Sequence, residues 1–170
     1  MSEERGVFWL PSLGIWKRYS GFAIMIAVGI DMFAVRLLAE GHLHILQWAR
    51  SQTPPCPWNA WTCAYTAQNG RIDVLQWLRG RTPPCPWNAF VCVYAAGNGH
   101  LDVLQWLRSQ TPPCPWNEDT CAVAAEYGRL DVLQWVRSQT PPCPWDIQHC
   151  LRLAGRKRDA EMEVFIRSHL

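Results

Sequence analysis

"TPPCPWN" stands at residues 82–88 and recurs unchanged at residues 53–59 and 111–117, while residues 140–146 repeat it with Asp in place of Asn. Each copy begins 29 residues after the one before it. Two interpretations compete for so unusual a heptapeptide. A Cys between prolines, repeated, would suit a metal or redox site, and it would equally suit the connector between stacked structural units. The residues between the copies help to decide between these interpretations.

The same step of 29 residues governs most of the chain. The recurring residues are one glycine series (Gly41, Gly70, Gly99, Gly128), two tryptophan series (Trp48, Trp77, Trp106, Trp135 and Trp58, Trp87, Trp116, Trp145) and two cysteine series (Cys56, Cys85, Cys114, Cys143 and Cys63, Cys92, Cys121, Cys150). Together they include all eight Cys and eight of the eleven Trp. A fixed period of this kind is typical of repeat proteins, in which a unit buries its apolar surface only by stacking on its neighbours.

Each unit predicts two short helices followed by an extended connector. In the copy that starts at Asn117, this residue is a suitable N-cap, since its side chain can accept a hydrogen bond from a first-turn N–H. Residues 120–126 are rich in Ala, which favours helix, and Gly128 suits the left-handed residue that ends a helix. Residues 130–137 are apolar except for a polar residue at every third position, so we predict a mostly buried second helix. The paired prolines then end it.

The helical stretches resemble a known family. Residues 129–139 (RLDVLQWVRSQ) resemble the second helix of an ankyrin repeat, and residues 121–132 (CAVAAEYGRLDV) resemble its first helix and turn. The step is shorter than the common ankyrin unit of about 33 residues, and such short units with a CPW connector resemble ankyrin arrays of algae, protists and large DNA viruses. The resemblance implies an all-α, ankyrin-type helix-turn-helix solenoid with Pro-rich connectors in place of β-hairpins. Its expected units are residues 30–58, 59–87, 88–116, 117–145 and a degenerate copy at 146–170.

Residues 1–29 are the part of the chain that the repeat does not explain. Gly21–Ile30 is apolar and follows Lys17 and Arg18, but this uncharged run has ten residues, against roughly 20 that a membrane-spanning helix needs. We expect a buried capping helix here; a membrane or targeting role and a loosely packed extension are the alternatives. With no convincing signal peptide or transmembrane segment, we expect a cytoplasmic, reducing setting.

The cysteines have three possible roles, as metal ligands, redox groups or core residues. Structural zinc sites usually pair their ligands as Cys-x₂₋₄-Cys, whereas the spacing here is Cys-x₆-Cys. Disulfides between equivalent Cys of successive units fit poorly, because packed helices lie about 8–10 Å apart and bridged Cα atoms lie within about 7 Å. Free Cys behaves as a small hydrophobe. We therefore expect reduced, metal-free Cys in the core and connectors and no cofactor, with metal binding and redox chemistry as the alternatives.

The tryptophans and histidines bear on ligand binding and catalysis. Burial of eight repeated Trp would stabilise the fold strongly, so we expect them in the core, with an aromatic ligand surface as the alternative. The five His share no repeat position and accompany no phosphate-binding glycine loop or metal-binding helix motif. We therefore expect no catalytic site.

Comparison of the copies within the chain separates constant positions from variable ones. The variable positions form three sets: Trp61, Phe90 and Asp119 just inside the first helix; Gln68, Asn69, Gly97, Asn98, Glu126 and Tyr127 just before the turn glycine; and Arg71, His100 and Arg129 just after it. In ankyrin repeats such columns contact partners, so the resemblance implies that these residues are candidates for partner binding. Drift at solvated positions would give the same variation.

These observations predict a non-catalytic protein–protein interaction module or scaffold. Trp61 and Phe90 are the expected anchors, since Asp119 at the same position of the third copy indicates that packing does not demand an apolar residue there. We expect a monomer that binds another protein and no nucleic acid, because the net charge is only +2. The basic residues near the end, Arg152 and 156–158, are expected to be the solvated face of a capping unit, with lipid or nucleic acid contact as the alternative. The second hypothesis for the whole chain is a structural or membrane-associated repeat protein anchored through Gly21–Ile30.

Overall fold

The computed structural model describes residues 7–10, 15–18, 43–51, 53, 55 and 58–170. Near the start of the chain, β1 (Val7–Leu10) and β2 (Ile15–Arg18) form an antiparallel pair in which Trp9 lies opposite Trp16. The sequence analysis predicts no strands here, so this pair is a correction to it. The expected capping helix or membrane segment at Gly21–Ile30 lies outside the described residues.

From Leu43 onward, every regular element in the described residues is an α-helix, which confirms the all-α prediction for this part of the chain. The helices are α3 (Leu43–Ser51), α4 (Ala60–Gln68), α5 (Ile72–Arg79), α6 (Ala89–Asn98), α7 (Leu101–Ser109), α8 (Glu118–Glu126), α9 (Leu130–Ser138), α10 (Ile147–Lys157) and α11 (Ala160–Arg167). They follow the predicted order, in which a first helix, a tight turn, a second helix and a connector make up each unit.

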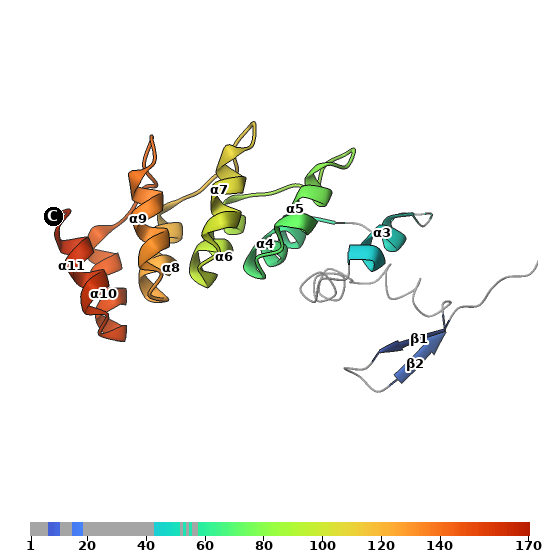
Figure 1. Ribbon diagram of the computed structural model, residues 1–170, viewed down its shortest axis with the longest axis horizontal. Coiled ribbons are helices and arrows are strands. Elements are labelled where there is room, and N and C mark those ends of the chain that lie inside the picture. Colours follow the sequence, from blue (N-terminus) through green and yellow to red (C-terminus); the bar gives the residue numbers. More distant parts are fainter. Residues whose placement is uncertain (1–6, 11–14, 19–42, 52, 54, 56–57) are drawn as a thin grey trace, which may run out of the picture.

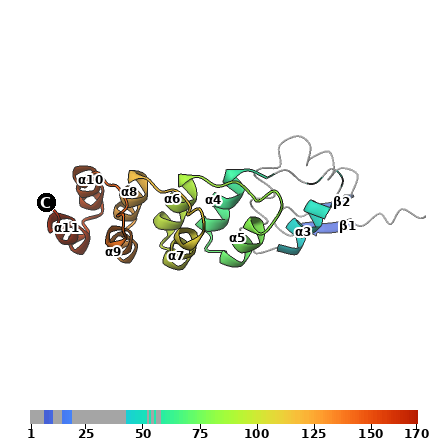
Figure 2. The same ribbon diagram turned by 90° about the horizontal axis from the view of Figure 1, so that it is seen from above.

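The helix pairs α4/α5, α6/α7, α8/α9 and α10/α11 lie side by side along the molecule (Figure 1). In the view from above, the first helices form one row and the second helices form another (Figure 2). The tight turns lie at one end of the pairs and the Pro-rich connectors at the other (Figure 1). The arrangement therefore leaves each pair with neighbours on both sides, except at the ends of the row.

The first helices begin at the Asn that follows each connector Trp. Asn59 Oδ1 accepts a hydrogen bond from the Trp61 N–H at 2.9 Å, and Asn88 Oδ1 accepts one from the Phe90 N–H at 3.1 Å. These are the predicted N-caps, which satisfy first-turn N–H groups that have no partner within the helix. In the third copy the side-chain cap predicted at Asn117 is not formed, because its amide instead donates to Asp119 Oδ2 at 2.8 Å.

The turn between the two helices of a unit depends on glycine. Gly70, Gly99 and Gly128 have φ angles of 67°, 80° and 66°, which is the left-handed conformation that only glycine adopts without strain. The prediction of a left-handed turn residue is therefore confirmed. At the other end of the pairs, the Thr82–Pro83, Thr111–Pro112 and Thr140–Pro141 peptide bonds are cis, a feature that the sequence analysis does not predict.

The core runs continuously between the two rows of helices. The first helices contribute mainly small residues, which let neighbouring first helices pack closely. The second helices contribute Val and Leu. The buried residues of the unit at residues 88–116 illustrate the set that the units share: Val91, Cys92, Ala95, Ala96, Val103, Leu104, Leu107 and Cys114.

The last pair keeps the repeat with one inserted residue. Sequence alignment at a step of 29 places Lys157 at the glycine position and Val164 at the tryptophan position. In the structure α10 is longer, Arg158 takes the left-handed conformation with φ of 56°, and Asp159 Oδ1 caps α11. A step of 30 then brings Phe165 to the tryptophan position, half-buried like Trp135. The last unit, expected to be a degenerate copy at residues 146–170, therefore differs from the others by one inserted residue.

Candidate functional site

Four aromatic rings meet on the exposed face of α4 and α6, and we call this cluster the aromatic platform. The rings of Trp61 and Phe90 stack with 5.4 Å between centroids and 15° between planes. Tyr65 and Tyr94 stack at 5.8 Å, one helical turn further along, and Trp61 contacts both Tyr rings at 6.0 and 6.2 Å. Trp61 remains 42% exposed and Phe90 45% exposed. The two predicted anchors therefore form one surface rather than two separate contacts.

Tyr65 and Tyr94 are members of the site that the sequence analysis misses. Each lies four residues after a predicted anchor, and residues four apart lie on the same face of a helix. Their signal was present, because the equivalent residue of α8 is Val123 and the position therefore varies between copies. Both Tyr rings are half-buried and support the two more exposed rings.

The same face of α8 is acidic rather than aromatic. Asp119 occupies the position of Trp61 and Phe90, and Glu118 precedes it where α4 and α6 have Ala. Both carboxylates are exposed. Acidic residues in a first turn are also favourable for the helix, because they oppose its N-terminal partial positive charge.

The second set of candidates lies where the first helices end. The side chains of Asn69 and Asn98 donate to the carbonyl oxygens of Tyr65 and Tyr94 at 2.8 and 2.9 Å, and both Asn remain exposed. Tyr127 is 55% exposed. The others are half-buried or buried: Gln68 and Glu126 are half-buried, and Gly97 is buried beside the Tyr127 ring. The exposed members extend the face of the aromatic platform toward the turns.

The third set, Arg71, His100 and Arg129, lies at the turns and is half-buried. His100 Nε2 donates to the carbonyl oxygen of Gln68 at 2.9 Å, and Arg129 Nε donates to the carbonyl oxygen of Gly97 at 3.2 Å. Each side chain thus binds the end of the first helix in the preceding unit, where cations and donors are favoured. Arg71 lies 3.7 Å from Asp73. His100 and Arg129 therefore connect neighbouring units.

The connectors fold back onto the second helix of their own unit. The Cys114 N–H donates to the carbonyl oxygen of Leu107 at 3.0 Å, and the Arg108 guanidinium donates to the Cys114 carbonyl at 2.6 Å. The same guanidinium lies 3.9 Å from the centre of the Trp116 ring, within range of a cation–π interaction. The arrangement recurs at Arg79, Cys85 and Trp87 and at Arg137, Cys143 and Trp145.

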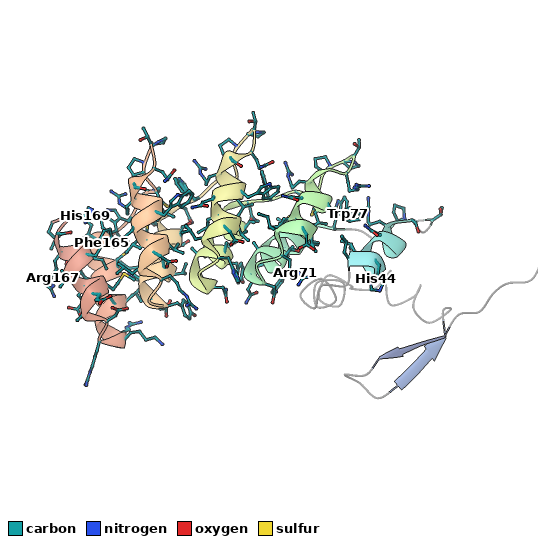
Figure 3. All side chains as sticks on the ribbon, in the orientation of Figure 1. His44, Arg71, Trp77, Phe165, Arg167 and His169 are labelled. Carbon is teal, nitrogen blue, oxygen red and sulfur yellow. The ribbon has the colours of Figure 1, made fainter. Side chains whose placement is uncertain are left out.

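The repeated tryptophans form edge-to-face pairs between neighbouring units, at the connector end of the molecule. The pairs are Trp58–Trp77, Trp87–Trp106 and Trp116–Trp135, with centroids 6.1 to 6.3 Å apart. Figure 3 labels Trp77 toward the connector end of α5 and Arg71 at its turn end. All six rings are half-buried and pack against the core. The prediction of core tryptophans is therefore confirmed only in part, and Arg side chains cover the faces of Trp58, Trp87 and Trp116.

The described cysteines are buried and form no disulfide with one another; Cys56 lies outside the described residues. The three described connector thiols each donate to the carbonyl of the Asn that starts their unit, as Cys85 does to Asn59 at 3.4 Å. The hydrogen bond with Cys63 and burial raise the pKa of the Cys85 thiol far above its usual range. Burial, with the charge of Asp146, raises the pKa of Cys150 to about 11. The Cys85 and Cys150 thiols are therefore protonated at neutral pH, and a protonated thiol is a poor nucleophile and metal ligand. The hydrogen bond with Cys121 instead lowers the pKa of the Cys143 thiol.

Two further properties concern the described residues as a whole. No three His, Cys, Asp or Glu side chains among them gather closely enough to hold a metal ion. None of the described helices combines the length and the apolar character that crossing a bilayer requires.

Comparison with models of protein families gave no match to this chain, and comparison with curated proteins gave none either.

Proposed function

We propose that the chain is an ankyrin-type helix-turn-helix solenoid that binds another protein, without catalysis, through the exposed face of α4, α6 and α8. The architecture is supported by features that recur in the units at residues 59–87, 88–116 and 117–145. Turn glycines, capping Asn residues and connector contacts recur in successive units, as stacked repeats require. A cytoplasmic location belongs to the same proposal.

The aromatic platform is the observation that carries the proposed function. Trp61 and Phe90 are each more than two-fifths exposed, although a soluble protein gains little from exposing large rings. The fold does not require them, since α8 also begins after an Asn with an extended backbone and has Asp119 at that position. Large aromatic side chains dominate the energies of protein interfaces, and they lose little conformational entropy when a partner covers them. A protein surface is therefore the partner that this platform suits.

The third set of candidates has a different role in the proposal. The side chains of His100 and Arg129 donate to carbonyl groups of the preceding unit. Their role is therefore to connect neighbouring units, and their variation between copies is no sign of partner binding. The proposed surface therefore consists of Trp61, Phe90 and Asp119, with Tyr127 and the exposed Asn residues at its edge.

Affinity capture from the source cell tests this proposal when wild type is compared with a Trp61→Ala/Phe90→Ala double variant. Loss of one such anchor typically costs at least about 2 kcal/mol of binding free energy, or about thirtyfold in affinity. We therefore expect the double variant to lose the partners that wild type retains. A Gln76→Ala/Gln105→Ala variant is the matched control, because both Gln are exposed on the row of second helices.

Circular dichroism and thermal unfolding establish that both variants are folded. Equal capture by wild type and the Trp61→Ala/Phe90→Ala variant would contradict the proposed surface. If the Gln76→Ala/Gln105→Ala variant loses the partners instead, the interface lies on the row of second helices.

A further inference from the structure

The chemistry of the exposed face changes along the row of first helices. The position just inside the helix holds Trp61 in α4, Phe90 in α6 and Asp119 in α8, and it holds the uncharged Gln148 in α10. Glu118 adds a second carboxylate beside Asp119. An apolar area and an anionic area thus adjoin each other on one face.

The two carboxylates are available to a partner. Both are exposed, and within the described part of the chain neither takes part in a salt bridge. Asp119 Oδ2 accepts one hydrogen bond from the Asn117 side chain, which leaves its other oxygen open. A cationic side chain would find an unoccupied acceptor there, whereas the phosphates of a nucleic acid would be repelled.

The distance between the two areas follows from helix packing. Phe90 and Asp119 hold the same position on neighbouring helices, and neighbouring helices pack about 8–10 Å apart. A peptide in the polyproline II conformation advances about 3.1 Å per residue with three residues per turn, so its residues three positions apart lie on the same face and span this distance.

Resting on the proposed function, we propose that the partner segment is a peptide in the polyproline II conformation with a large apolar residue and, three positions away, an Arg or Lys. The apolar side chain covers Trp61 and Phe90. The cationic side chain pairs with Asp119 and Glu118. The surface therefore selects its partner by the spacing of an apolar and a basic residue.

Selection from a phage-displayed library of random linear 12-residue peptides on the full-length chain tests this inference. We expect the enriched peptides to share a large apolar residue three positions from Arg or Lys. A Glu118→Lys/Asp119→Lys variant is expected to enrich acidic residues at that second position. An Asp131→Lys variant, which changes an exposed carboxylate on the row of second helices, is the matched control and is expected to enrich the same peptides as wild type.

Direct titration of one enriched peptide gives the magnitude. An exposed ion pair contributes little, so Asp119→Asn is expected to weaken binding by up to about fivefold, against about thirtyfold or more for Trp61→Ala/Phe90→Ala. Peptides that need the platform but show no basic residue would overturn this inference and leave the proposed function standing. Peptides that bind the Trp61→Ala/Phe90→Ala variant as well as wild type would overturn both. A library that yields no enriched peptide would also overturn this inference.

Discussion

The connector end of the molecule and the exposed face of the first helices differ in how strictly they repeat. At the connector end, Arg79, Arg108 and Arg137 make the same contacts with a Cys carbonyl and a Trp ring in three successive units. On the exposed face, the equivalent positions hold Trp61, Phe90 and Asp119. The structure gives a reason for this difference. Each connector group makes contacts within the stack, whereas the exposed side chains make few such contacts.

Repetition therefore marks the groups that hold the units together, and variation marks the groups that are free to change. His100 and Arg129 qualify this rule, because they vary and yet bind the preceding unit. The backbone carbonyl is the constant partner there, and more than one cationic or donor side chain satisfies it. Variation alone is thus an incomplete guide to a binding surface, and exposure must be considered with it.

The largest expected effect is the difference in the free energy of unfolding between a variant of a core residue and a variant of an aromatic platform residue. Leu104 is fully buried, so Leu104→Ala is expected to lower the free energy of unfolding by about 2–5 kcal/mol. Among the described residues, Phe90 forms one aromatic pair, with Trp61, so Phe90→Ala is expected to cost about 0.5–1.5 kcal/mol, the worth of one such pair. Urea unfolding followed by circular dichroism measures both. A loss for Phe90→Ala as large as that for Leu104→Ala would show that the platform is part of the core.

The connector arginine gives the next effect in size. Arg108→Ala removes the hydrogen bond to the Cys114 carbonyl and the contact with the Trp116 ring. A hydrogen bond to a charged group and a cation–π contact together predict a loss of about 2 kcal/mol in the free energy of unfolding. Arg108→Lys is the informative control, since it keeps the charge but lacks the planar group that stacks on Trp.

We expect the urea midpoint of Arg108→Lys to fall between those of wild type and Arg108→Ala. If all three proteins unfold at the same urea concentration, the repeated contact has no role in stability, and the contrast between the two regions of the molecule loses its energetic basis.

The sequence predicted the helices well because their signals are local. The capping role of Asn59 and Asn88 and the left-handed turn at Gly99 depend on a few neighbouring residues, and the structure agrees with them. The one-residue insertion before α11 was missed because Arg158 takes the left-handed conformation without being glycine. Nothing in a comparison at a fixed step of 29 residues distinguishes this insertion from a decayed repeat.

The candidate site was predicted less completely than the helices. Exposure of Trp61 and Phe90 was expected from the substitution of Asp119, but their stacking on each other depends on how closely α4 and α6 pack. Arg108 lies over the Trp116 ring only because the connector folds back onto the second helix of its own unit. Such contacts join residues whose relation the sequence does not display, since they arise only after the units have folded and packed.

The smallest expected changes in the free energy of unfolding come from substitutions at two glycines, one on the variable face and one in the constant turn, that are separated by one residue. Gly97 belongs to the variable face of α6, and an added Cβ would lie 3.6 Å from Val123 and the Tyr127 ring, an ordinary contact distance. Gly99 belongs to the constant turn, has a φ of 80°, and an added Cβ would lie 3.1 Å from the Arg129 side chain. Gly97→Ala is therefore expected to stabilise the protein by up to about 1 kcal/mol, the gain of Ala over Gly within a helix. Gly99→Ala is expected to destabilise it by about 1–2 kcal/mol, because an L-residue is strained in the left-handed conformation. Urea unfolding of the two variants measures this opposite sign directly, and a shift of both midpoints in the same direction would show that the variable face and the constant turn are under the same constraint.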